Sequence, residues 1–402
     1  MGEVTPTGAI VWARATAPGR VTVEATAVAG GAPVVAEVAI GPETDLTGKV
    51  ALTNLRPATR YRYRVTSGGE TVTGEFATAP ASDTAPAVTL LWSGDLGSAK
   101  ACRRTDTGYR IFTTMAQRPA DFFLFVFVAR TVEEYRAKHR YNREDPAAGA
   151  FYRRVPVFAI WDDHEVFNDF SGPTHPRTAI GRRAFLDYWP LTPPAEDPVR
   201  LYRRFQWGRL LEVFILDTRS YRSPNAEPDG PGKTMLGRAQ REWLVNALAA
   251  SPATWKIVVT SVPLSVPTGR PDARDSWTGV SAFGLPLENA TGFAVERDRL
   301  LRLLRDRGVK NLVFLAADVH HAELIRHEPF PEFAVHEFIA GPLSASVGHP
   351  RPLDPALNPR SLFARGDVFN FGEITVDAAG LTVRIVDVDG AVLFTHTIGP
   401  AP

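Results

Sequence analysis

Four ionisable side chains follow directly after one apolar segment near the middle of the chain. Residues 155–160 form a run typical of a buried strand, and Asp162, Asp163, His164 and Glu165 come shortly after it. Parallel sheets present their chemistry at the carboxyl ends of their strands, where loops place polar groups beside a crevice. Such a cluster is costly to bury unless it coordinates or hydrogen-bonds something. The pattern favours metal binding or catalysis by Asp163 and His164 over a turn aspartate beside a surface histidine.

A second apolar segment ends in a similar way. Residues 311–317 run into Asp318, Val319, His320 and His321. On an extended segment the i, i+2 spacing places Asp318 and His320 on one side, where they could share a cation. His321 then faces the other way, which favours a supporting or structural role for its imidazole.

The third segment of this kind, residues 87–92, is followed by Ser-Gly and then by Asp95. A Gly-Asp pair at a strand end is common, but its place after the first strand of an α/β region makes Asp95 a candidate ligand. Carboxylate and imidazole groups suit a hard or borderline metal ion. We therefore predict that Asp95, Asp163, Asp318 and His320 converge on a site for one or two metal ions.

Two further groups have alternative interpretations. Arg219 follows the apolar strand at 210–216 and Asp217, and its guanidinium could bind a phosphate in bidentate fashion or form a buried ion pair with an aspartate. Cys102 could be a soft metal ligand. It lies in the polar segment 100–104, however, which favours a thiol that binds no metal.

Length and charge narrow the class of protein. The chain has 402 residues, with 45 Lys plus Arg against 44 Asp plus Glu. That length predicts two domains, and the balanced charge gives no sign of a nucleic-acid or membrane-surface partner. The single cysteine excludes an intrachain disulfide, and no apolar run is long enough for a transmembrane helix. No signal peptide is visible in the chain.

Residues 1 to about 78 are predicted to form a small all-β domain with a structural role, because short strands alternate there with Gly and Pro. Strict alternation over residues 55–65 places Tyr61 and Tyr63 on one face and arginines on the other. This strand resembles the fibronectin type III and immunoglobulin-like strand that carries a tyrosine corner. The small, Pro-rich residues 78–86 mark a linker.

Beyond the linker, strands alternate with helices, which predicts a mixed α/β layer sandwich with antiparallel strands added late. Helices are expected at 108–118, at 131–139 with Thr131 as the N-cap, and at 147–154, 238–249 and 295–307. Four strands without intervening helices are expected in the tail, at 333–338, 372–376, 381–386 and 391–397.

Four motifs together resemble one known family. They are Trp-Asp-Asp-His-Glu-Val at 161–166 with Asn168, Leu-Asp-Thr-Arg-Ser-Tyr-Arg at 216–222, Ala-Asp-Val-His at 317–320 and Gly-Pro-Leu-Ser-Ala at 341–345. With the strand at 55–65, they resemble alkaline phosphatase D (PhoD-like) enzymes of the calcineurin-type metallophosphatase superfamily. The resemblance covers nearly the whole chain.

This resemblance implies an N-terminal immunoglobulin- or fibronectin III-like domain, residues 1–80, and a metallophosphatase-like β-sandwich flanked by helices, residues 81–402, in an overall α/β class. It implies a dinuclear site for divalent or trivalent metal ions, with iron and/or calcium as the metals. The expected activity is hydrolysis of phosphate mono- or diesters, and the expected location is periplasmic, secreted or on the cell surface.

The resemblance also implies roles for single residues. His164 stands where the family's histidine assists the leaving group, and Asp163 stands where the superfamily has a metal-binding asparagine. Arg219 would stabilise the equatorial phosphate oxygens, and Arg219 and His321 are candidate substrate-binding residues. The candidate metal ligands are Asp95, Asp163, Asp318 and His320.

One departure from the family pattern affects the expected activity. The second strand should end in a Gly-Asp motif whose aspartate bridges the two metals, but residues 121–126 continue into Phe127, Val128, Ala129 and Arg130. The loop at 97–100 also differs from the expected glycine-rich loop. These departures predict weak hydrolysis, or a non-catalytic homologue that binds a ligand or a surface partner.

Overall fold

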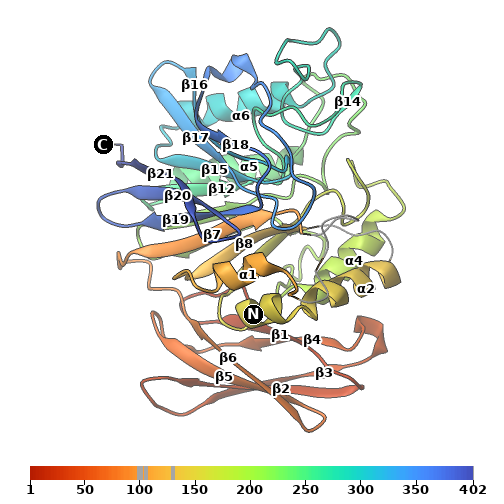
Figure 1. The fold of residues 1–402 in the computed structure, drawn as a ribbon, viewed down its shortest axis with the longest axis vertical. Helices are drawn as coiled ribbons and strands as arrows, with labels where there is room; N and C mark the ends of the chain where they lie inside the picture. Colours follow the sequence, from red (N-terminus) through yellow and green to blue (C-terminus); the bar gives the residue numbers. More distant parts are fainter. Residues whose placement is uncertain (97–102, 104–106, 128–131, 402) are drawn as a thin grey trace.

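The computed structural model describes residues 1–96, 103, 107–127 and 132–401, and it places an all-β N-terminal part beneath a larger two-sheet sandwich (Figure 1). Cys102, the loop at 97–100 and the expected N-cap Thr131 lie outside the described residues. No helix in the part of the chain that the structure describes is long and apolar enough to span a bilayer.

The N-terminal part contains only strands and one short 3-10 helix, as predicted. A four-stranded antiparallel sheet has the order β3-β2-β5-β6, and β1 pairs with β4. The elements are β1 (Ala9–Arg14), β2 (Gly19–Ala27), β3 (Val34–Ile40), η1 (Pro42–Thr44), β4 (Thr47–Leu52), β5 (Arg60–Ser67) and β6 (Glu70–Ala77).

The alternation predicted for β5 is confirmed. Tyr61 and Tyr63 are buried, whereas Arg60, Arg62 and Arg64 are exposed. The hydroxyl of Tyr61 accepts a hydrogen bond of 2.9 Å from the backbone N–H five residues upstream, which is the bond that a tyrosine corner makes. The more specific likeness to a fibronectin III or immunoglobulin domain stays a prediction.

The first sheet of the sandwich has six strands in the order β21-β20-β19-β7-β8-β9. Its parallel strands are β7 (Val88–Gly94), β8 (Phe122–Phe127) and β9 (Val157–Trp161). The antiparallel strands are β19 (Asn370–Val376), β20 (Leu381–Asp387) and β21 (Val392–Ile398), which confirms three of the four strands expected in the tail.

The second sheet has seven strands in the order β10-β11-β12-β15-β17-β16-β18. The fourth strand expected in the tail is β17, and it pairs parallel with β15 in this sheet. The strands are β10 (Arg203–Trp207), β11 (Leu211–Ile215), β12 (Trp255–Val259), β15 (Leu312–Ala316), β16 (Ala322–Phe330), β17 (Phe333–Ile339) and β18 (Pro359–Arg365). Two short strands, β13 (Gly269–Arg270) and β14 (Ala273–Arg274), form a separate pair.

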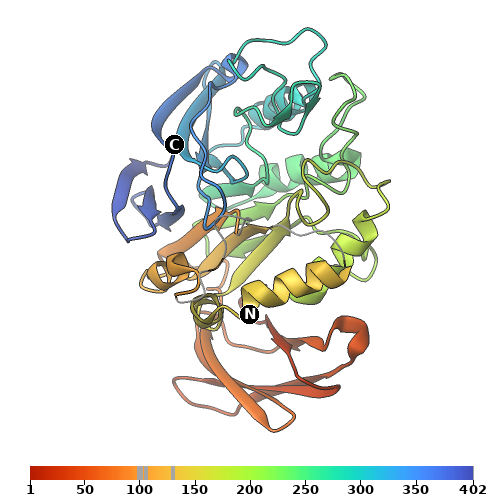
Figure 2. The same ribbon diagram turned by 45° about the vertical axis from the view of Figure 1, so that its right-hand side comes forward.

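The two large sheets pack face to face, and helices cover the sandwich on both sides (Figures 1 and 2). Trp92 of β7 and Phe338 of β17 meet between the sheets with ring centroids 6.4 Å apart. Phe151 of α3 packs on Phe123 of β8, with centroids 5.6 Å apart, on the outer face of the first sheet. The helices are α1 (Arg110–Met115), α2 (Val132–Arg143), α3 (Pro146–Tyr152), α4 (Thr178–Tyr188), α5 (Gly237–Ala250), α6 (Ala294–Asp306) and η2 (Pro355–Leu357).

The first residues of the chain lie on the edge of the first sheet. Gly2 pairs parallel with Val157 of β9 and antiparallel with Ile10 of β1. The backbone N–H of Val157 donates to the carbonyl of Met1 at 2.9 Å. This short segment therefore pairs with the start of β9 and joins the N-terminal part to the sandwich.

Candidate metal centre

The predicted site residues come together at the carboxyl ends of β7, β9 and β15. Carboxylate oxygens of Asp162, Asp163 and Asp318 lie within 4.8 Å of one another. Asp95 Oδ1 lies 3.7 Å from His320 Nε2, and the charges of both Asp163 and His320 act on the Asp95 carboxyl. The structure thus brings Asp95, Asp163, Asp318 and His320 into one cluster; their role as ligands stays a prediction.

Burial raises the pKa of three carboxyl groups in this region, those of Asp95, Asp162 and Asp318. Desolvation raises the pKa of Asp162 to about 7, although Arg219 opposes the shift. Desolvation and then the charges of Asp162 and Asp163 raise the pKa of Asp318 well above its usual range. Desolvation also raises the pKa of Asp95, against the lowering effect of His320. A divalent cation would favour the charged form of each group.

Two oxygens of the cluster fit a cation site directly. Asp95 Oδ2 and Asp318 Oδ2 are buried and have no hydrogen-bond partner among the residues that the structure describes. A buried carboxylate oxygen without a donor is unfavourable unless a cation takes that place. Oxygen-rich sites with one imidazole suit divalent ions such as calcium, manganese or iron.

The backbone of the cluster is held in an uncommon conformation. Asp95, Asp318 and His320 have φ values of 59°, 69° and 60°, in the left-handed region that non-glycine residues rarely adopt. Such residues gather at functional sites, where the surrounding fold fixes their side chains in one direction.

In the metal-free protein the Asp162 carboxyl should contribute more to stability at about pH 5 than at about pH 7.5. Since the pKa of Asp162 is about 7 in the folded chain and near 4 when unfolded, the folded state retains a proton that the unfolded chain has released. Stability is therefore fully present below the unfolded pKa and falls as the pH rises toward the folded pKa, by about 1.4 kcal/mol per pH unit for each such proton. Because the pKa values of His139, His336 and the Met1 amino group are lowered by burial and oppose this trend, the contribution is measured as the difference in stability between the parent protein and Asp162→Asn, both treated with EDTA. The stability of the parent relative to this variant should fall as the pH rises, and a divalent cation should abolish that fall. A relative stability that increases with pH would contradict the raised pKa of Asp162.

His164 lies beside the cluster and faces solvent in part. Its side chain is 32% exposed, and its Nε2 is 3.8 Å from Asp163 Oδ2. Glu165, in contrast, is buried and accepts a hydrogen bond of 2.7 Å from the backbone N–H of Asp162. His164 is therefore accessible from solvent beside the cluster, whereas Glu165 shapes the turn that follows β9.

The contacts of Arg219 favour the ion-pair interpretation over phosphate binding. The residue is fully buried, and its Nε donates to Asp162 Oδ1 at 2.7 Å. Its two terminal nitrogens donate to the two oxygens of Asp275, each at 2.7 Å, and one also donates to the carbonyl of Phe170. Asp217 lies nearby but bonds the turn backbone and Trp161. The predicted contact of Arg219 with substrate therefore needs correction, because protein carboxylates already hold its guanidinium.

The substrate-binding prediction for His321 needs the same correction. The side chain is fully buried, with Nδ1 3.2 Å from the carbonyl of Val319 and Nε2 3.2 Å from Glu323 Oε2. The prediction that this segment is extended was wrong, because Asp318 and His320 lie in a bend between β15 and β16 and have left-handed φ values of 69° and 60°. The neighbouring His320 is 31% exposed, and its Nδ1 lies 3.1 Å from Ser346 Oγ.

Sequence reasoning missed two aspartates of the centre. Oxygens of Asp169 and Asp275 lie within 4.8 Å of each other and of Asp163. Asp275 lies in a loop with no motif of its own, so only the need of Arg219 for a carboxylate partner could have pointed to it. Asp169 lies three residues after the motif at 161–166 and has a φ of 57°. Its backbone N–H donates to Asp163 Oδ2 at 2.7 Å.

The end of β8 offers no substitute for the Gly-Asp motif in the described part of the chain. β8 ends at Phe127, and residues 128–131 lie outside the described residues. Glu133 is exposed on α2, and the side chain of Glu134 is not described. The cluster described above therefore includes no acid from this strand or from the described start of α2.

Comparison with known proteins agrees with the geometry of the centre. Residues 126–385 match the model of the PhoD-like phosphatase family, and residues 1–80 match that of the PhoD-like phosphatase N-terminal domain. Alkaline phosphatase D of Bacillus subtilis is 28% identical over 215 residues, which is 47% of this chain and 35% of the relative. The matched region thus spans about a third of that relative's own length.

Two solved structures share the fold over nearly the whole chain. A PhoD structure superposes with a TM-score of 0.79 at 19% identity, covering 100% of this chain and 91% of the other. The purple acid phosphatase PPD1 from yellow lupin superposes with a TM-score of 0.71 at 15% identity, covering 99% and 73%. The arrangement of sheets, with acidic residues clustered at the strand ends, is therefore that of a metallophosphatase, and the chain belongs to the PhoD-like phosphatase family.

Proposed function

We propose that this chain is a metal-dependent phosphoric-ester hydrolase, with mono- and diesters as its substrate class and a location outside the cytoplasm. The observation that carries the proposal is the cluster of buried carboxylates with two unpartnered oxygens beside the half-exposed His164. Asp95, Asp163, Asp318 and His320 would hold the cations, with Asp162 and Asp169 adjacent. Cations held there, iron and/or calcium by family likeness, supply Lewis-acid chemistry that activates water and neutralises phosphate charge.

The protein's own groups have separate tasks in this proposal. His164 donates a proton to the departing oxygen, because it stands at the solvent side of the cluster. Arg219 holds Asp162 and Asp275 in place and keeps its charge away from substrate. We propose residues 1–80 and 81–402 as the two domains, the first supporting the second.

The absence of the Gly-Asp motif supports the proposal that the activity is weak. Two cations about 3.5–4 Å apart repel strongly, and a shared carboxylate is the usual means of holding them. We therefore propose at most one tightly bound metal and slow hydrolysis. Turnover of a chromogenic phosphomonoester and a diester, with elemental analysis of the same sample, tests this. Two stoichiometric metals with brisk hydrolysis would show that another group bridges.

The second candidate is a non-catalytic homologue that binds a ligand or surface partner. The described end of β8 favours this candidate, because its last residues, Val126 and Phe127, are not acidic and cannot bridge two metal ions. The same measurements separate the two: a tightly bound metal with no turnover of either ester supports the binding protein.

His164→Ala should reduce turnover by about 100- to 10,000-fold and leave most of the metal bound, since proton transfer is lost while the carboxylates remain. Asp318→Ala should lose both metal and turnover. Rates and metal content of the two variants, with His349→Ala as an exposed histidine control, distinguish these roles. If His164→Ala loses metal as completely as Asp318→Ala, His164 is a ligand and the assignment fails.

A further inference from the structure

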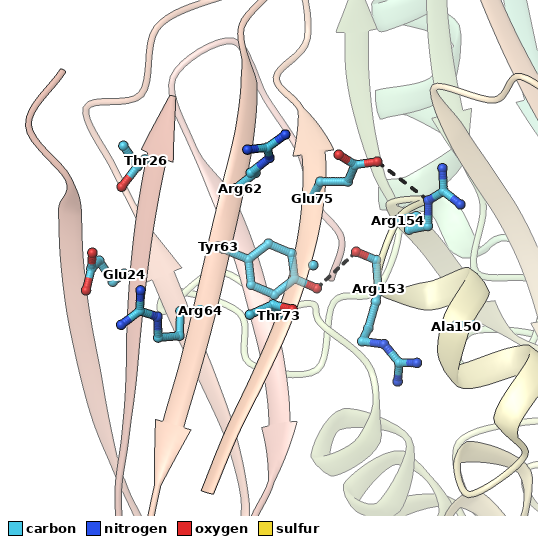
Figure 3. Close-up of a pocket in the computed structure, with 11 residues that line it drawn as sticks. Glu24, Thr26, Arg62, Tyr63, Arg64, Thr73, Glu75, Ala150, Arg153 and Arg154 are labelled. Carbon is cyan, nitrogen blue, oxygen red and sulfur yellow. Dashed lines mark hydrogen bonds and ion pairs between the residues drawn. The ribbon is translucent and has the colours of Figure 1, made fainter. Parts of the chain in front are cut away.

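A basic groove runs along the seam between the N-terminal sheet and the end of α3 (Figure 3). Its main cavity has a volume of about 570 Å³. The charged side chains that line it are four arginines and two glutamates, with no lysine: Arg62, Arg64, Arg153, Arg154, Glu24 and Glu75. The groove therefore has an excess of guanidinium groups, which bind tetrahedral and planar oxyanions through two parallel hydrogen bonds.

The strand geometry spaces the arginines of one wall. Arg60, Arg62 and Arg64 alternate with buried residues on β5, so their side chains project from the same face. Successive members of this row are about 7 Å apart along the strand. Arg153 and Arg154, at the carboxyl end of α3, form the opposite wall.

Most of these guanidinium groups form no ion pair. Arg154 Nε lies 3.5 Å from Glu75 Oε1, and Arg60 lies 4.0 Å from the same oxygen. Arg62, Arg64 and Arg153 make no side-chain ion pair or hydrogen bond within the described part of the chain. Glu75 and Glu24 lie opposite Arg62 and Arg64 in the strand register, so the four arginines of the main cavity exceed its carboxylates by two charges.

The groove is long rather than round. A second cavity of about 190 Å³ shares Glu75 and Arg154 with the first and adds Arg60 and Arg118 to the lining. Arg118 is already paired with Glu373 at 2.7 Å. The row from Arg60 to Arg64 spans about 14 Å, which a single small anion would fill only in part.

The two walls are fixed relative to each other. The hydroxyl of Tyr63 donates to the carbonyl of Arg153 at 3.2 Å, and the N–H of Glu75 donates to the same carbonyl at 3.0 Å. A Cβ at Gly74 would lie 2.5 Å from this carbonyl oxygen, so glycine allows the strand to approach. The groove is therefore present before a ligand arrives, which lowers the entropic cost of binding.

We propose that this groove binds a linear chain of phosphate groups. Successive phosphates of a chain can contact the arginine row on β5 and, across β6, the arginines at the end of α3. Each tetrahedral phosphate directs its oxygens to several sides, whereas a planar carboxylate matches one guanidinium fork. The groove lies at the amino end of β9 and the metal centre at its carboxyl end, about 17 Å away along five residues. The proposal concerns binding alone and does not depend on turnover.

The test uses EDTA-treated protein and fluorescently labelled linear inorganic polyphosphate, with anisotropy recorded as a function of salt. The triple variant Arg62→Gln, Arg64→Gln, Arg153→Gln should bind at least about 10-fold more weakly. In a plot of log affinity against log salt concentration, the slope of this variant should be smaller in magnitude by about 2, because each of the three lost phosphate contacts contributes about 0.7. The control triple Arg20→Gln, Arg110→Gln, Arg238→Gln removes the same charge from exposed arginines elsewhere and should bind nearly as the parent protein does.

A variant that is expected to bind polyphosphate more tightly separates ligand binding from a structural role of the arginines. Glu75→Gln removes the carboxylate between Arg60 and Arg154, so it should tighten polyphosphate binding several-fold. Orthophosphate should compete poorly because it reaches only part of the row. Equal losses in the two triple variants, poly-glutamate binding as tight as polyphosphate binding, or no polyphosphate binding by the parent protein would each overturn the proposal.

Discussion

Replacing Arg219 with methionine should lower the free energy of unfolding by about 3–5 kcal/mol, because it leaves buried Asp162 without its cation and leaves Asp275 with Arg222 alone. Asp162 and Asp275 are both buried, and Arg219 donates to each at 2.7 Å. Metal affinity should change as well, since Asp162 belongs to the carboxylate cluster. Arg219→Lys should recover only part of the stability, because an ammonium cannot reproduce the fork that Asp275 accepts.

Arg238→Met provides the matched control for this change. Arg238 pairs with Glu242 at 2.7 Å, but both side chains are exposed, so its removal should cost no more than about 1 kcal/mol. Urea unfolding with metal content measured in parallel separates the cases. An Arg219→Met protein that is as stable as the control but has a raised KM would favour the alternative that Arg219 contacts the substrate.

Inserting the family's Gly-Asp-containing loop between Val126 and Phe127 should raise turnover by on the order of 100-fold or more and add a second metal ion. The inserted aspartate would supply the shared carboxylate that a two-metal site needs to position its reactants. Elemental analysis and turnover of a chromogenic diester measure both effects. The same insertion with Gly-Asn in place of Gly-Asp is the control, because it restores loop length without the charge.

If both insertions gave the same activity, loop length would be the missing element and the bridging role of the aspartate would be wrong. If neither raised turnover, the proposal that this motif limits the present chain would fail.

The strands that carry the centre were predictable because each is a short apolar run ending in polar residues. β9 and β15 are buried along their whole length and β7 at every position except Thr89, and Asp95, Asp163 and Asp318 follow the ends of these strands. Their convergence follows from parallel pairing, since the carboxyl ends of parallel strands meet at one edge.

The partner of Arg219 was not predictable from local sequence. A buried guanidinium forms the same bidentate bonds with phosphate and with carboxylate, so residue type alone leaves both interpretations open. Asp275 lies 56 residues away in a loop, where no periodicity marks it. Helix α4 was also missed, and so was the placement of β17, whose pairing with β15 depends on tertiary contacts that a linear pattern does not encode.

The pairing of Gly2 with Val157 has a consequence for any dissection of the molecule. Excising residues 1–80 would free the backbone N–H of Val157 at the start of this edge strand, and free edge groups are a template for pairing with another chain. The same strand carries Asp162 and Asp163 at its other end. The sandwich expressed without residues 1–80 should therefore aggregate more readily than the whole chain, along the strand that leads to the metal centre.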